Sequence, residues 1–228
     1  GLLGLLFIYA GVNFVLAFEN VLMIPLVVSF ASETAAGAVV SAAGFGMLAG
    51  SLAVSAWGGP KRRRIAWIMG GIAVDGLAVL AAGSRRSLVV IGAAYVFLML
   101  LLPVVNTSSQ VIWQLKVAPG MQGRVFSLRR MLSQIASPLA IVLAGPLADR
   151  VFEPLLAPGG ALAGSVGRVI GTGRGRGIAF MFLLIGLATM LMAAIGWLHP
   201  RIRHLETEIP DQIPDTAAPA TGAGSPPA

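Results

Sequence analysis

The chain has 228 residues, of which 57% are hydrophobic and 11% charged, with a formal net charge of +7. Soluble domains carry about 25% charged residues, so this composition excludes an ordinary soluble domain. Cysteine is absent, which excludes disulfides and thiolate metal sites. The basic side chains form short clusters between apolar runs, which is typical of topology signals and lipid headgroup contacts, and we expect no nucleic-acid partner.

Six apolar runs fill most of the chain, and we expect each to be a helix that crosses a membrane. Crossing a hydrocarbon core of roughly 30 Å takes about 20 apolar residues in a helix. The runs cover residues 2–30, 34–57, 65–83, 88–113, 131–149 and 177–198. The sequence therefore predicts an all-α membrane protein with six transmembrane helices in residues 1–200. Because the first run starts directly at Gly1, without a basic segment before it, we expect the chain to begin inside a longer polypeptide.

The first run carries a narrow polar stripe on an otherwise apolar helix. Tyr9, Asn13 and Asn20 fall within about 40° of one another at 100° per residue. Glu19 lies on the flank of this stripe. Such a stripe either bonds neighbouring helices together or lines a cavity, and both interpretations stay open.

The second run is rich in small residues, which let helix backbones approach closely in lipid. Gly46 and Gly50 have Gly-x-x-x-Gly spacing, and a second set shares another side of the helix: Gly37, Ser41, Gly44, Ser51 and Ser55. Close helix packing is the favoured interpretation.

Asp75 lies near the middle of the third run, with Gly71 one turn earlier. An ionised carboxylate at the centre of a bilayer costs about 2.5–3.5 kcal/mol on insertion scales, and such groups mark ion or substrate paths. We therefore predict that Asp75 and Glu19 lie on an ion or substrate path, where a buried carboxyl group is suited to bind and release protons. The alternative is a protonated acid that bonds a neighbouring helix for packing.

The fourth run places Asn106, Gln110, Trp113 and Gln114 on one helix face, after Pro103. This stripe, like that of the first run, either bonds neighbouring helices together or lines a cavity. Asn106 and Gln110 join Tyr9, Asn13, Asn20, Glu19 and Asp75 as candidates for a substrate cavity. The connection 154–176 is rich in Gly and Arg, lacks the Gly-Lys-Ser/Thr of a phosphate-binding loop, and is predicted to be flexible.

After Pro200 the helix should stop, and residues 201–228 are predicted to form a largely disordered tail.

The basic residues indicate which ends of the runs share a compartment. Alternate connections carry ten Lys and Arg residues on one face and six on the other. The ten are Lys61, Arg62, Arg63, Arg64, Lys116, Arg124, Arg129, Arg130, Arg201 and Arg203; the six are Arg85, Arg86, Arg150, Arg168, Arg174 and Arg176. The positive-inside bias places the first face and the C-terminus in the cytosol. Trp57, Trp67, Trp113 and Trp197 all fall at the same predicted interface.

Three stretches resemble the C-terminal half of a major facilitator superfamily transporter. The first, Gly50-Ser-Leu-Ala-Val-Ser-Ala-Trp-Gly58-Gly-Pro-Lys-Arg62-Arg63, is similar to the cytosolic Gly-x-Leu-Ala-Asp-Arg-x-Gly-Arg-Arg loop, with Val54 in place of its Asp. The second runs from Pro103 through Pro119 to Gln122-Gly123-Arg124-Val-Phe126, and the third from Pro138 to Pro154. The similarity is to exporters of macrolides and enterobactin, and to those encoded with nonribosomal peptide synthetases. Gly145-Pro-Leu-Ala-Asp149-Arg150 fits the loop pattern better, but counting spans places it at the opposite face.

The resemblance implies that the chain is spans seven to twelve of a secondary transporter in the bacterial cytoplasmic membrane. It implies export of an amphipathic organic compound such as an antibiotic, siderophore or peptide natural product by proton antiport with alternating access. The expected partners are this substrate, protons, lipid, the missing N-terminal half and a nonribosomal peptide synthetase. The cytosolic gate would use Gly50, Gly58, Lys61, Arg62, Arg63, Gly123 and Arg124.

Two other functions remain open on the sequence. A six-span permease subunit of an ATP-driven importer would need a Glu-Ala-Ala loop, which neither 58–64 nor 116–130 contains. A non-transporting anchor of a synthetase complex is the second. We expect no enzyme, no cofactor and no metal site, since the two histidines, His199 and His204, both lie at the end of the last run and no nucleophile–base pair can be proposed.

Overall fold

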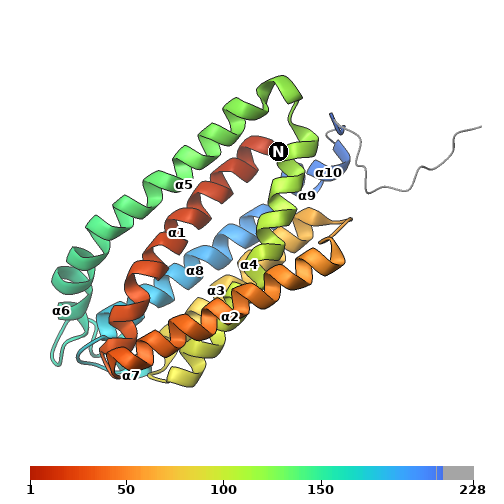
Figure 1. Ribbon diagram of the computed structural model, residues 1–228. Coiled ribbons are helices and arrows are strands. Elements are labelled where there is room, and N and C mark those ends of the chain that lie inside the picture. The colour runs from red at the N-terminus through yellow and green to blue at the C-terminus, as the bar shows by residue number, and fades with distance from the viewer. Residues whose placement is uncertain (209, 213–228) are drawn as a thin grey trace, which may run out of the picture.

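The computed structural model describes residues 1–208 and 210–212, and within these residues all regular structure is helical (Figure 1). Six helices are long and apolar enough to cross a membrane. They are α1 (Leu2–Val28), α2 (Glu33–Trp57), α3 (Arg64–Ser84), α4 (Leu88–Lys116), α5 (Pro119–Leu147) and α8 (Arg176–Leu198). The prediction of an all-α chain with six helices of membrane-spanning length is confirmed for the part of the chain described.

Local sequence explains several helix ends. The Ser32 hydroxyl accepts a hydrogen bond from the Ala35 N–H at 3.2 Å, and the Ser87 hydroxyl accepts one from the Val90 N–H at 3.4 Å, so both serines cap helix N-termini. Helix α2 ends at Trp57, and its C-cap is Gly58, whose φ of 83° is a left-handed conformation that glycine adopts without steric cost. Helix α8 ends at Leu198, before Pro200, as predicted.

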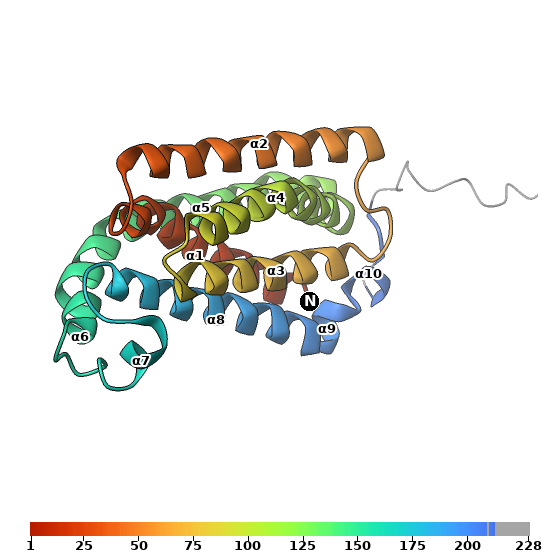
Figure 2. The ribbon, with the colours of Figure 1, turned by 90° about the horizontal axis from the view of Figure 1, so that it is seen from below.

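The six long helices form two similar units of three: α1, α2 and α3, followed by α4, α5 and α8. The contacts run in the order α2, α4, α3, α8, α1, α5, so that α2 and α5 each lie at an end of the array. The array is symmetric: α1 corresponds to α4, α2 to α5 and α3 to α8, and exchanging the members of each pair gives the same order in reverse. In Figure 2, α2 and α8 accordingly lie on opposite sides of the bundle, with α4 and α3 between them. Because each unit has three antiparallel helices, the second unit starts from the opposite end of the bundle.

The connections alternate between two ends of the bundle. One end, which we call the basic end, carries Gly1, residues 58–63 and 117–118, and the short helices α9 (Pro200–Arg203) and α10 (Leu205–Glu208). Gly1 packs against Arg201 and Leu205 there. The far end carries residues 29–32, 85–87 and 157–175. The predicted grouping of connections is confirmed, and Asp149–Arg150 does lie at the far end.

The predicted start of the fifth helix was wrong. The sequence placed residues 116–130 in a loop and the helix at 131–149, whereas α5 begins at Pro119. Proline is favoured in the first turn of a helix, and no further proline follows before Pro138. Gln122, Arg124, Arg129 and Arg130 lower the local hydropathy but do not prevent helical hydrogen bonding.

The connection 154–176 is folded, in contrast to the predicted flexible loop. A π-helical turn η1 (Ala148–Phe152) continues α5 into α6 (Glu153–Leu156), and α7 (Val166–Ile170) follows. Leu156 and Ile170 are buried in the core that includes α8. The apolar residues between the glycines therefore attach this connection to the core of the bundle.

The segment after α8 is also more structured than predicted. Leu205 is fully buried, and the Glu206 carboxylate accepts a hydrogen bond from the Ile65 N–H at 2.6 Å. Lys116 at the end of α4 forms an ion pair with Asp211 at 2.8 Å. Residues 200–208 and 211 thus bind the ends of α3 and α4. The predicted disorder at 209 and 213–228 lies outside the described residues.

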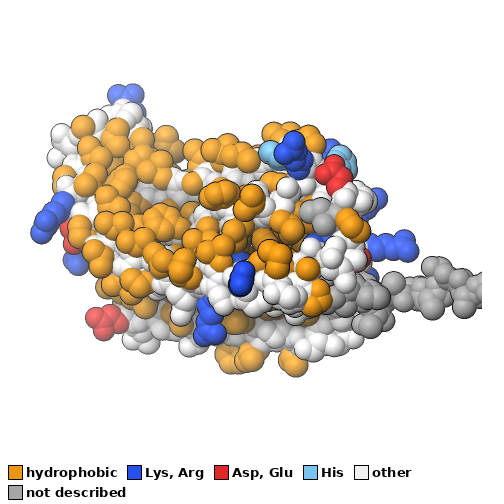
Figure 3. Space-filling view, turned by 90° about the horizontal axis from the view of Figure 1, so that it is seen from above, with side chains coloured by type: hydrophobic (Ala, Val, Ile, Leu, Met, Phe, Trp, Pro, Cys, Tyr) orange, Lys and Arg blue, Asp and Glu red, His pale blue; other side chains and the backbone are white. Residues whose placement is uncertain are grey.

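Large hydrophobic side chains cover the outside of the bundle, as lipid contact requires. In Figure 3, they spread over most of the visible face, while most charged side chains lie toward the two ends of the helices. The exposed hydrophobic residues of α5 include Met131, Ile135, Leu139, Ile141, Val142 and Leu143.

Candidate functional site

A cavity of about 200 Å³ lies between α1, α3 and α4. Apolar side chains form most of its wall, and its polar groups come from α1 and α4. The lining residues are Leu5, Ile8, Tyr9, Val12, Asn13, Leu16, Ile68, Ile72, Leu102, Val105, Asn106 and Ser109. A largely apolar cavity with a few polar groups is the usual form of a site for a small organic molecule.

The polar stripe of α1 divides between this cavity and the outer surface. The Asn13 side-chain amide donates to the Tyr9 carbonyl at 2.8 Å, and its oxygen accepts from the Ser133 hydroxyl of α5 at 2.6 Å. Tyr9 and Asn13 both line the cavity, and Asn13 also bonds to α5. Asn20 is exposed and donates to the Leu16 carbonyl of its own helix at 2.8 Å, so it lies away from the cavity.

Helix α4 contributes Asn106 to the cavity wall, and Gln110 stands one turn further along the same face. Both side chains are exposed in this chain, and Gln110 accepts a hydrogen bond from Arg129 at 3.4 Å. Gln110 does not line the cavity, whereas Ser109, which was not predicted, lines it together with Asn106.

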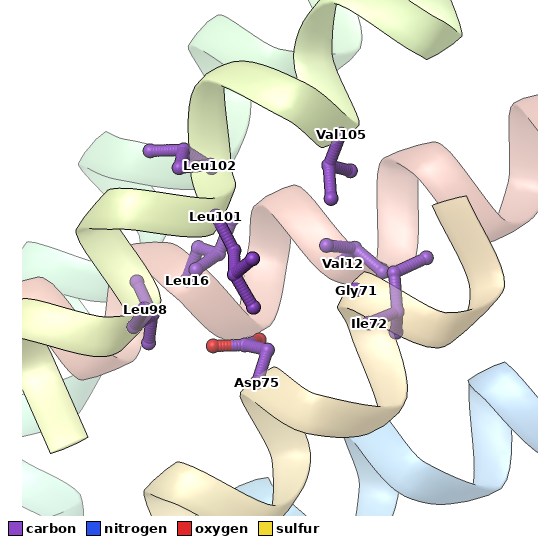
Figure 4. Close-up of a pocket in the computed structure, with 9 residues that line it drawn as sticks. All are labelled: Val12, Leu16, Gly71, Ile72, Asp75, Leu98, Leu101, Leu102 and Val105. Atoms are coloured by element: carbon purple, nitrogen blue, oxygen red, sulfur yellow. The ribbon is translucent and has the colours of Figure 1, made fainter. Parts of the chain in front are cut away.

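Asp75 lies in a smaller pocket of about 40 Å³ that shares a wall with the larger cavity. Val12, Leu16, Ile72, Leu102 and Val105 line both spaces. Figure 4 shows the Asp75 carboxyl group reaching from α3 toward Leu16 and Leu101, among apolar side chains. Its Oδ1 atom is buried and has no hydrogen-bond partner among the described residues. Gly71 gives room for the Val105 side chain, which would collide with any Cβ at that position.

Glu19 is one of the most deeply buried polar residues of the described chain, with 2% of its surface exposed. Its Oε1 atom has no hydrogen-bond partner in the part of the chain described. The Tyr95 hydroxyl of α4 donates to the backbone carbonyl of Glu19 at 3.2 Å, which attaches this turn of α1 to α4. Glu19 and Asp75 are close enough to interact electrostatically, and two charged carboxylates would repel one another.

Arg129 is the main residue of the site that was not predicted. Only 6% of its surface is exposed, and its guanidinium carbon lies 4.4 Å from the ring centre of Tyr9 and 4.9 Å from that of Trp113. It donates to the Ser109 hydroxyl at 3.1 Å. The prediction placed Arg129 in a cytosolic loop because hydropathy put the start of the fifth helix at 131. A prediction that started the fifth helix at Pro119 would have placed Arg129 within that helix, where it can face the bundle.

The tryptophans separate into two kinds. Trp57, Trp67 and Trp197 are between 44% and 53% exposed, as expected for side chains at a membrane interface. Trp113 is only 2% exposed and packs inside the bundle beside Arg129. The predicted interfacial role of Trp113 is therefore wrong, although it lies in the last turn of α4.

The gate candidates do not form one cluster. Lys61, Arg62, Arg63, Gly123 and Arg124 are exposed at or near the basic end, and Gly58 is the exposed C-cap of α2. Gly50 is instead buried against the Leu100 carbonyl of α4, and Gly46 against the Val96 carbonyl. These two glycines hold α2 close to α4, which confirms the packing interpretation of the Gly-x-x-x-Gly pair.

The second small-residue face of α2 has a different environment. A Cβ placed on Gly37 or Gly44 would meet no atom of the described residues within 4 Å, and Ser41 and Ser55 are exposed. This face therefore makes no close helix contact within the described chain.

No family model, no curated protein and no solved structure matches this chain. Among residues 1–208 and 210–212, no group of three or more His, Asp or Glu side chains is arranged to hold a metal ion.

Proposed function

We propose that this chain is the C-terminal half of a major facilitator superfamily exporter, which moves an amphipathic organic compound out of the cell in exchange for protons. The observation that carries the proposal is the pair of buried carboxyl groups of Glu19 and Asp75, each with one buried oxygen atom that has no hydrogen-bond partner among the described residues. Asp75 lies in a pocket that shares a wall with the cavity lined by Tyr9, Asn13 and Asn106. Acidic groups at membrane depth are costly and are typical of proton pathways.

The repeated packing of three and three helices supports the same proposal. Secondary transporters are commonly built from inverted repeats, with the substrate site near the middle of the membrane between them. Here the cavity lies between α1 and α4, which correspond in the two units. In the proposed mechanism, protonation of Asp75 or Glu19 removes a buried charge and changes which way the cavity opens.

The remaining parts of the proposal concern partners and location. A separate N-terminal half would form the second wall of the cavity, and the exposed Lys61, Arg62, Arg63 and Arg124 would pair with its acids at an inward gate. The basic end would face the cytosol of a bacterial cell, where a nonribosomal peptide synthetase supplies the substrate. Lipid would cover the outer hydrophobic surface.

The test is proton antiport by the full-length transporter in inverted membrane vesicles that contain a pH-sensitive dye. Addition of a transported macrolide or siderophore should release protons from acidified vesicles. Asp75→Asn fixes the neutral state of the side chain, so proton release should fall at least tenfold while expression is unchanged. Asp149→Asn is the matched control, since Asp149 is exposed at the far end.

Gradient-dependent proton release by Asp75→Asn at the wild-type rate would remove Asp75 from the mechanism and leave Glu19 as the candidate, to be tested as Glu19→Gln. Transport that continues without a proton gradient but requires ATP would instead support a permease subunit. Co-purification with a synthetase, without any transport, would support a membrane anchor.

A further inference from the structure

We infer that the cavity between α1, α3 and α4 accepts an organic carboxylate, which binds to the guanidinium group of Arg129. The carboxylate would belong to the substrate of the proposed transport function, on which this inference rests. Arg129 bonds to Ser109 and packs on Tyr9, and both of these residues line the cavity. Arg129 therefore stands at the edge of the space that a substrate would fill.

The charge of Arg129 is not balanced by an acid in the described chain. No carboxylate among the described residues lies within 4 Å of its nitrogen atoms. Its hydrogen-bond partners among the described residues are neutral side chains, including those of Ser109 and Gln110. A buried cation without a counter-charge is costly, and an anion in the cavity would offset that cost.

The unsatisfied groups around Arg129 are hydrogen-bond donors. Arg129 Nε and Trp113 Nε1 are both buried and have no partner within the described residues. Neither group can accept a hydrogen bond, so a ligand that satisfies them has to present acceptor atoms. A carboxylate presents two oxygens in one plane, which matches the planar array of donors on a guanidinium group.

The surroundings favour an organic anion over a free inorganic ion. The rings of Tyr9 and Trp113 flank the guanidinium group at 4.4 Å and 4.9 Å, and Phe126 lies at 5.9 Å. The cavity wall beyond them is mainly Leu, Ile and Val. A molecule with a carboxylate at one end and an apolar body fits both parts.

Because Trp113 lies beside Arg129, its fluorescence can report ligand binding in the absence of a proton gradient. Trp57→Phe, Trp67→Phe and Trp197→Phe, all at exposed sites, leave Trp113 as the single tryptophan of these 228 residues, which are to be expressed by themselves. In purified protein, benzoate should then change the Trp113 fluorescence in a saturable way, and benzamide, which has the same ring and no charge, should not. Arg129→Gln should weaken benzoate binding at least tenfold. Arg130→Gln, which changes the net charge equally at the exposed neighbouring residue, should leave it within twofold.

Arg129→Lys provides a second test if Arg129→Gln fails to fold. It keeps the charge but loses the planar donors, so benzoate should bind more weakly and still be preferred to benzamide. Equal responses to benzoate and benzamide, no saturable response to benzoate, or unchanged binding in Arg129→Gln would each overturn the inference. Benzoate binding that depends on Arg129, together with vesicles that show no proton antiport, would uphold the carboxylate site and reject the transport function.

Discussion

The contact between α2 and α4 depends on two glycines, and replacing one of them tests the packing directly. A Cβ at position 50 would lie 2.9 Å from the carbonyl carbon of Leu100 and 3.1 Å from its Cα, and would collide with its carbonyl oxygen. These are backbone atoms and cannot rotate away, so Gly50→Ala has to push the two helices apart.

The expected cost follows from this geometry. Overpacking at a tight contact destabilises by about 1–3 kcal/mol. For a chain of this length, each kcal/mol lowers the melting temperature by roughly 2–4 °C, so Gly50→Ala should melt several degrees below the wild-type protein in detergent. Gly44→Ala is the matched control on the same helix, because its Cβ would meet no atom of the described residues within 4 Å. Alanine is the better helix former, and this variant should be as stable as wild type or slightly more so.

The melting temperature would be followed by circular dichroism, with a cysteine pair as an independent measure of helix spacing. The chain has no cysteine, and a Cβ at Gly92 lies 3.9 Å from Val39 Cγ2. Val39→Cys with Gly92→Cys should therefore cross-link α2 to α4, and Gly50→Ala should slow that reaction. Equal melting temperatures for Gly50→Ala and Gly44→Ala, with equal cross-linking, would refute the close contact.

Two further predictions concern the ends of the bundle. Single cysteines at Ser165 and Gly120, both exposed, should report topology, with an impermeant thiol reagent labelling Ser165→Cys from outside intact cells and not Gly120→Cys; the reverse pattern would place the basic end outside. Glu206→Gln should lower stability by about 1–2 kcal/mol because the Ile65 N–H at the start of α3 loses a charged acceptor at 2.6 Å. The same change at exposed Glu208 should leave the melting temperature unchanged, and equal effects of the two variants would show that the contact with α3 contributes nothing.

The number of long helices, most of their bounds and the end at which each connection lies follow from the sequence alone. Hydropathy over about 20 residues is a local sum, and it depends little on which helices become neighbours. It therefore located five of the six long helices to within three residues at either end. Hydropathy did not locate the start of α5, because charged side chains lower the summed hydropathy of this segment although its backbone is helical.

The meeting of polar side chains from different helices depends on the tertiary structure. Asn13 and Ser133 are 120 positions apart in the chain and 2.6 Å apart in space, and Arg129 joins α5 to α1 and α4. Asn20 shares the helix face of Tyr9 and Asn13 by angle, but it lies further along α1, where that face is exposed. A helical wheel predicts the direction of a side chain but not which residue of another helix it contacts, because that contact depends on how the helices pack.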